Sequence, residues 1–164
     1  IMPSLVGSEM CIRDRALTSH IKDYWQQHGK GDRLLLSYHG IPIRYVMKGD
    51  PYFKQCQATT KALQHGLQLE DEKIIMGFQS RFGFTKWLNP YTDVLLNTLP
   101  KKGIKNLDVF SPNFVFDCLE TIEELAINGK NRFLQAGGKQ FNFIPCLNND
   151  PYFVEAIANL ISQQ

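Results

Sequence analysis

The sequence predicts an α/β protein with a Rossmann-like parallel sheet of about four strands and helices on both faces. Two observations predict this fold: short apolar runs typical of buried strands recur along the chain, and stretches with helical periodicity separate them. Parallel strands need a crossover connection, which a helix supplies. The length of 164 residues, 43% of them hydrophobic, suits one domain with a sizeable core.

The first part of the chain divides near residue 14. Residues 1–13 mix proline, glycine and serine with scattered apolar residues and show no sustained period. We therefore expect residues 1–13 to be a disordered or artefactual leader, unrelated to the rest of the chain. A single domain follows over residues 14–164. Apolar residues at positions 17, 21 and 25 share one stripe, which predicts a helix from Ala16 to about His28 that Gly29 ends.

The remaining elements alternate as crossover units require. A strand is predicted over residues 33–38, between charged residues and a glycine and proline pair. A helix over 52–67 leads to a strand over 73–78, and a helix over 91–99 leads to a strand over 106–110. A third helix, from 118 to about 134, precedes a strand over 140–144, and a last helix covers residues 152–161.

Composition and cysteine spacing exclude several functional classes. Eighteen basic and sixteen acidic residues give a formal charge of +2, so nucleic acid is not an expected partner. The four cysteines form no C-x-x-C pair, which favours reduced thiols in a cytoplasmic protein. No apolar stretch reaches the ~18 residues of a membrane span, so we expect no transmembrane segment and at most a peripheral membrane contact.

Polar and aromatic residues follow the predicted strands at the point where each strand ends. His39 follows the first strand, and Arg81 and Trp87 lie in the loop after the second. The carboxyl ends of parallel strands meet at one edge of a sheet, where α/β proteins bind ligands. We expect a cleft there that suits a flat, largely apolar ligand with acidic groups. His39, flanked by Tyr38, is either poised for chemistry or a loop histidine with a structural role.

Three carboxylates lie at the start of the helix after the third strand. Asp117, Glu120 and Glu124 have the spacing i, i+3, i+7, which places them on one face of an α-helix. Such acidic residues either favour the positive end of the helix and face solvent or, opposite His39, handle a divalent metal ion. No C-x-x-C or H-x-x-x-H spacing accompanies them, so any metal ion would be weakly held and in transit.

Four segments of the sequence carry a family resemblance. They are SYHGIP at 37–42, FQSRFG at 78–83, WLNPYTD at 87–93 and DCLETIEE at 117–124. In this order, and continuing from about Ala16 to the C-terminus, the chain closely resembles ferrochelatase of the bacterial type. The resemblance implies one Rossmann-like half, the C-terminal one, of the two-domain chelatase fold.

The resemblance also implies an enzyme, a lyase of the metal chelatase type. Its reaction is the insertion of ferrous iron into protoporphyrin IX, or coproporphyrin, to form haem, the last step of haem biosynthesis. By motif, His39 and Glu120 are the catalytic pair on opposite sides of the macrocycle. Together with Glu124 they are also the residues expected to contact the metal ion.

Three further residues are expected to bind the porphyrin. The resemblance makes Trp87 a wall of the pocket and Arg81 a candidate for its rim, and Tyr38 is expected to shape the pocket beside His39. Porphyrin and ferrous iron are both substrates, so we expect no permanently bound cofactor. Some ferrochelatases hold an iron–sulfur cluster through a C-terminal cysteine group, and we expect none here.

Members of this family are about twice as long as the present chain. The resemblance does not include their first Rossmann-like half, which we expect as a packing partner of the final helix. Two alternative functions stay open. One is a related chelatase that loads cobalt or nickel into a tetrapyrrole, and the other is a fragment that binds porphyrin or haem without turnover.

Overall fold

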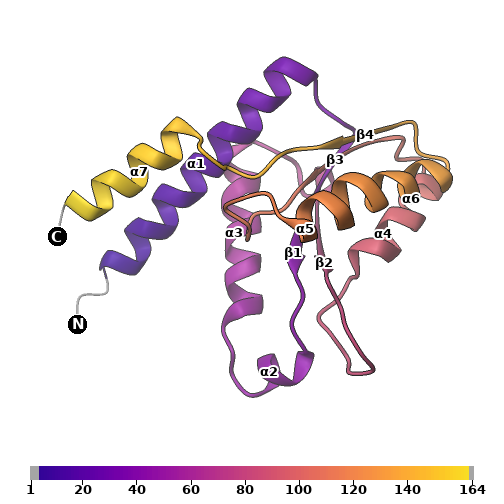
Figure 1. Cartoon of the computed structure of the whole chain (residues 1–164), viewed down its shortest axis with the longest axis horizontal. Coiled ribbons are helices and arrows are strands. Elements are labelled where there is room, and N and C mark those ends of the chain that lie inside the picture. The colour runs from indigo at the N-terminus through magenta and orange to yellow at the C-terminus, as the bar shows by residue number, and fades with distance from the viewer. Residues whose placement is uncertain (1–3, 163–164) are drawn as a thin grey trace.

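Four parallel strands form one sheet in the computed structural model, which describes residues 4–162 (Figure 1). The strands are β1 (Arg33–His39), β2 (Ile74–Gln79), β3 (Asn106–Phe110) and β4 (Gln140–Phe143), in the spatial order β2-β1-β3-β4. All three pairings are parallel, with β1 between β2 and β3. The predicted fold class is confirmed.

Helices connect the strands in the predicted alternation. They are α1 (Ser4–His28), α2 (Ile43–Met47), α3 (Tyr52–Gly66), α4 (Thr92–Thr98), α5 (Leu119–Thr121), α6 (Lys130–Gln135) and α7 (Pro151–Ser162), with short 3₁₀ turns η1 (Asp71–Lys73) and η2 (Pro100–Lys102). Between α5 and α6 lies η3 (Ile122–Gly129), which is π-helical. Within residues 4–162, no helix has both the length and the apolar character that crossing a bilayer demands.

The sheet separates two apolar cores, one under each layer of helices. Figure 1 shows α1, α3 and α7 on one side of the strands and α4 and α6 on the other. Because side chains alternate along a strand, Tyr38 of β1 packs into the core with α1 and α3, whereas Leu35 packs into the core with α4 and α6. The same alternation turns Ser37 and His39 toward the α4 side of the sheet.

Three helical elements differ from the predicted ones. The first helix begins at Ser4 and not at Ala16, and residues 4–13 contain no proline to break a helix. The sequence prediction omits α2, because five residues are too few for a helical period to be read. The helix predicted over 118–134 is divided among α5, η3 and α6.

Gly129 ends the π-helical segment where it approaches α4 closely. A Cβ at this position would meet Leu96 Cδ1 at 3.2 Å and the Glu124 carbonyl oxygen at 3.1 Å. A glycine therefore permits η3 to pack against α4 at this point. The close packing holds η3 beside the carboxyl end of β2, where the candidate site lies.

Candidate functional site

His39 ends β1 at the carboxyl edge of the sheet. In the parallel register it lies opposite Gln79, the last residue of β2. Its backbone carbonyl accepts a hydrogen bond from the Tyr52 hydroxyl, and its ring lies edge-on to Phe114, with 6.1 Å between centroids. Neither ring nitrogen has a hydrogen-bond partner among the described residues. The half-buried imidazole is thus free to exchange a proton or to contact a metal ion.

Trp87 lies over the residue that follows His39. Its indole Nε1 donates a hydrogen bond to the Phe82 carbonyl at 2.8 Å. A Cβ added at Gly40 would come within 3.4 Å of Trp87 Cε3 and within 2.7 Å of the Gln79 carbonyl oxygen. Only glycine fits between these two groups. The indole is therefore held beside His39, in a place where it can form an aromatic wall of a cleft.

Glu120 reaches this edge from α5. The Gln79 side chain donates a hydrogen bond to the backbone carbonyl of Glu120 at 2.7 Å. The pKa of the Glu120 carboxyl is lowered, mainly because the Cys118 thiol donates to it; its own backbone adds to the effect, and the charge of His39 makes the smallest contribution. Glu120 is therefore ionised at neutral pH, the state that attracts a cation or accepts a proton.

Glu124 lies further along, in the π-helical segment. The Ser80 hydroxyl donates to Glu124 Oε2 at 2.8 Å, and the Gln79 amide lies 3.5 Å from the same oxygen. Ser80 has a positive φ of 61°, a conformation uncommon for residues other than glycine, directly after the end of β2. Consecutive residues at the end of one strand thus contact both Glu120 and Glu124.

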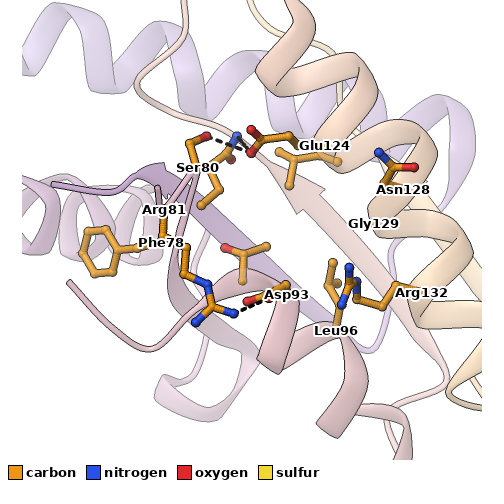
Figure 2. A pocket seen from close by; sticks show the side chains of 12 residues that line it. Phe78, Ser80, Arg81, Asp93, Leu96, Glu124, Asn128, Gly129 and Arg132 are labelled. Carbon is orange, nitrogen blue, oxygen red and sulfur yellow. Dashed lines mark hydrogen bonds and ion pairs between the residues drawn. The ribbon is translucent and has the colours of Figure 1, made fainter. Parts of the chain in front are cut away.

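A hollow of about 280 Å³ lies between α4 and η3, and Glu124 and Arg132 are among its lining residues (Figure 2). Arg81 also lines it: Nη2 pairs with Asp93 Oδ2 at 2.8 Å, and the guanidinium group lies 4.3 Å from the centre of the Tyr91 ring. Both partners of the ion pair are part-exposed, with 47% and 38% of their side chains accessible. An acidic group of a ligand can therefore compete with Asp93 for the guanidinium group.

Tyr38 lies on the opposite side of the sheet from His39. Its side chain is 1% exposed, and its hydroxyl pairs with Thr60 of α3 at 2.9 Å. Its ring packs against Phe78 in the same core. The alternation that turns His39 toward the cleft turns its neighbour away from it. Because its side chain is buried on the far side of the sheet from His39, we leave Tyr38 out of the proposed site.

Asp117 does not continue the line of carboxylates predicted for an α-helix. It precedes α5, and its carboxylate faces the loop after β4 instead. Oδ1 accepts a hydrogen bond from the Cys146 backbone at 3.1 Å, and Oδ2 accepts one from the Asn148 side chain at 2.7 Å. The reason is local: Asp117 lies outside the helix, so the i, i+3 relation to Glu120 does not apply.

The three residues predicted to contact a metal ion do not form a closed metal site. In the part of the chain that the structure describes, no three His, Cys, Asp or Glu side chains come together in a way that could hold a metal ion. His39 ends β1, whereas Glu120 and Glu124 are held at the end of β2. A closed set of ligands is typical of structural metal sites, and an open arrangement suits an ion that must be passed on.

Sequence reasoning did not single out Gln79, Ser80 or Cys118 as part of the site. Gln79 is buried and contacts Glu120, Ser80 contacts Glu124, and the Cys118 side chain lowers the pKa of the Glu120 carboxyl. Gln79 and Ser80 lie in the segment 78–83, directly at a predicted strand end. That position was the available signal, since strand ends in a parallel sheet form the ligand-binding edge.

The sheet topology and the contacts at its edge define an α/β protein with a histidine and two carboxylates at the carboxyl edge of its parallel sheet. The family model described as Ferrochelatase matches residues 14–164. This chain belongs to the ferrochelatase family. It is 50% identical over 146 residues to a ferrochelatase of Vibrio parahaemolyticus, which covers 89% of this chain and 46% of that protein.

A second relative agrees with the first. The chain is 48% identical over 149 residues to ferrochelatase 1 of Shewanella oneidensis, which covers 91% of this chain and 45% of that protein. The chain thus spans about half the length of the curated relatives that it matches. Among solved structures, a CbiX protein of Marinobacter aquaeolei VT8, assigned to cobalamin biosynthesis, has a TM-score of 0.52 at 14% identity, covering 80% of this chain and 94% of that chain. This likeness shows the fold alone.

Proposed function

We propose that this chain supplies the metal-insertion edge of a ferrochelatase, a lyase that inserts ferrous iron into protoporphyrin IX or coproporphyrin to form haem. Membership of the family and the two named relatives support the proposal. The observation that carries it is that Gln79 lies opposite His39 in the sheet register and donates a hydrogen bond to the Glu120 carbonyl at 2.7 Å, which places two residues distant in the sequence at one edge of the sheet.

The chemistry of porphyrin metalation suits these side chains. A porphyrin must lose its pyrrole N–H protons and accept a metal ion that has shed most of its water. An imidazole such as that of His39 accepts a proton when it is neutral, and Glu120 is ionised and attracts a cation or a proton. We assign His39 and Glu120 as the catalytic pair, on opposite sides of the macrocycle. These two residues and Glu124 are the proposed contacts of the iron.

The aromatic and basic residues of the cleft suit the macrocycle itself. The Trp87 indole offers a flat apolar face to a flat ring, and aromatic pairs of this kind gain energy beyond the area they bury. The Arg81 guanidinium can pair with an acidic side group of the porphyrin. We assign Trp87 to a wall of the porphyrin pocket and Arg81 to its rim. Ferrous iron is a substrate, and the proposal includes no permanently bound cofactor, no iron–sulfur cluster and a cytoplasmic location.

The rest of a full-length ferrochelatase is the packing partner that we propose for α7. The curated relatives are about twice as long as this chain. The side chains of α7 that stay exposed within the described residues include four large apolar ones, Tyr152, Val154, Ile157 and Ile161. An apolar surface of this kind is typical of a protein interface.

The experiment that tests the function is an anaerobic titration of the 164-residue chain with protoporphyrin and then ferrous iron, followed by absorption spectroscopy. Formation of haem well above the protein-free rate would support a complete catalytic edge. A shift of the Soret band without metalation would identify a porphyrin-binding fragment. Faster insertion of cobalt or nickel than of iron would identify a related chelatase, and no spectral response at all would contradict the proposal for the isolated chain.

A further inference from the structure

Gln79 contacts the backbone of Glu120 and of Gly40, the residue that follows His39. It lies opposite His39 in the sheet register and is 6% exposed. Its backbone carbonyl accepts a hydrogen bond at 2.9 Å from the N–H of Gly40, the residue after His39. Its side-chain Nε2 donates to the Glu120 carbonyl at 2.7 Å. A single buried residue thus connects the strand that carries His39 with the helix that carries Glu120.

The hydrogen-bond partners of the Gln79 amide fix its orientation. Only the amide nitrogen can donate to the Glu120 carbonyl, so Oε1 faces Ser37, whose hydroxyl donates to it at 2.7 Å. The Ser37 oxygen then accepts a hydrogen bond from the Thr92 hydroxyl at 2.8 Å. A continuous chain of hydrogen bonds therefore runs from α4 through β1 and β2 to α5.

Turning this amide would leave buried polar atoms without partners. The Ser37 hydroxyl, the Thr92 hydroxyl and the Gln79 amide all lie in buried residues. In the described part of the chain, every buried side-chain nitrogen and oxygen has a hydrogen-bond partner. Because an unpaired buried polar group is costly, the network resists rearrangement. The contact between Gln79 and Glu120 is thus rigidly supported from the sheet side.

We propose that Gln79 is a positioning residue for metal insertion, which fixes the spacing of His39 and Glu120 across the cleft. This inference rests on the proposed function. Groups that transfer protons or contact a reacting metal ion act only at a suitable separation, and a displacement of about 1 Å can cost ~100-fold in rate. The Gln79 side chain contacts the Glu120 carbonyl and the Ser37 hydroxyl, and its amide lies 3.5 Å from Glu124 Oε2. It therefore acts on kcat through these carboxylate-bearing residues and has little effect on porphyrin affinity.

The test compares Gln79→Asn and Gln79→Leu with the control Gln135→Leu, which alters an exposed glutamine at the end of α6. Asparagine keeps the polar amide but is one methylene too short to reach from Ser37 to Glu120. We expect both Gln79 variants to lower kcat for ferrous iron insertion at least ~10-fold, with KM for porphyrin within about threefold of the parent. Values of kcat within about twofold of the parent in both variants would overturn the proposal.

A second measurement does not depend on activity. Hydrogen exchange of the free 164-residue chain reports the protection of backbone amides in residues 117–125. Gln79→Asn should speed exchange there at least ~10-fold, while exchange in α3 stays as in the parent. Unchanged exchange would overturn the proposal even in a chain without activity. Failure of the parent chain to metalate porphyrin would instead count against the proposed function, and the exchange data would then decide on Gln79.

Discussion

Asp117 and Asn148 hold each other through two hydrogen bonds, one in each direction. The Asp117 backbone donates to Asn148 Oδ1 at 3.0 Å, and Asn148 Nδ2 donates to Asp117 Oδ2 at 2.7 Å. The two residues join the loop before α5 to the loop after β4. Because Glu120 follows in the first turn of α5, this pair fixes the direction from which the helix enters the cleft.

Loss of the Asn148 side chain should destabilise the fold. Asn148 has a positive φ of 50°, which glycine adopts without strain. We expect Asn148→Gly to lower the free energy of unfolding by about 1–3 kcal/mol through the lost hydrogen bonds. Asn148→Ala should cost about 1 kcal/mol more, because alanine is strained in this backbone conformation. Urea unfolding followed by circular dichroism measures both, and a glycine variant as stable as the parent would contradict the role of the pair.

The same contact should make stability depend on acid pH. Burial raises the pKa of Asp117, but hydrogen bonds from the Asn148 side chain, the Cys146 backbone and Thr121 outweigh it, so the pKa is lowered. A carboxyl whose pKa is lower in the folded state stabilises the fold above its unfolded-state pKa of about 3.9 and loses this effect as the pH falls through the folded-state value.

The expected result is a urea midpoint that declines below about pH 4 in the parent and declines less in Asp117→Asn. The control is Glu155→Gln, which alters an exposed carboxylate on α7 and should keep the parent's pH profile. Identical profiles for Asp117→Asn and the parent would show that this carboxylate does not contribute to acid unfolding.

His39 and Glu120 should be needed for the chemical step. We expect His39→Ala and Glu120→Gln each to lower the rate of ferrous iron insertion by on the order of 100-fold or more, since each removes a proton acceptor or a metal contact. The control is His65→Ala, which removes an exposed histidine on α3. Anaerobic absorption assays measure all three variants, and rates within a few-fold of the parent would remove both residues from the catalytic assignment.

Glu124 should act on the iron rather than on the porphyrin. Its carboxylate is exposed and is held by the Ser80 hydroxyl. We expect Glu124→Gln to raise KM for ferrous iron several-fold and to leave the porphyrin dissociation constant unchanged. Glu123→Gln, which alters the neighbouring exposed carboxylate, should change neither. Should both variants respond equally to iron, the effect would come from general surface charge and not from a specific contact.

Trp87 should contribute to porphyrin affinity. The indole is held by the Phe82 carbonyl beside Gly40. We expect Trp87→Ala to weaken porphyrin binding by about 0.5–1.5 kcal/mol, or roughly 2- to 12-fold, with Trp87→Phe between it and the parent because the aromatic face is kept. Soret titration gives the dissociation constants. Equal affinity of all three proteins would place the macrocycle elsewhere.

The strand pattern of this chain was readable from the sequence, and the geometry after β3 was not. Apolar runs bounded by charge and by glycine or proline predicted all four strands to within about two residues. The placement of His39 at the carboxyl edge of the sheet followed from the strand end. The buried position of Tyr38 follows from the alternation of side chains along β1. The prediction grouped Tyr38 with His39 because they are adjacent in the sequence, although adjacent residues of a strand point to opposite faces of the sheet.

The carboxylates show the limit of helical periodicity. Grouping Asp117, Glu120 and Glu124 on one face assumes an α-helix through all three positions, whereas the chain places one before the helix, one in α5 and one in η3. No sequence period marks a π-helix, because its stability depends on packing such as that of Gly129 against α4. The Ser80 and Gln79 contacts likewise depend on tertiary structure.

The π-helical segment has a consequence for how such a site changes over time. Its hydrogen bonds run i→i+5, whereas those of an α-helix run i→i+4, so each hydrogen-bonded ring encloses one additional residue. The hydrogen bond between Ser80 and Glu124 therefore depends on the number of residues in the π-helical segment as well as on their identity. Deleting one residue between Ile122 and Gly129 would restore an α-turn and swing the carboxylate to another side of the helix. In a lineage of these proteins, a change of length alone can redirect an acidic group without replacing it.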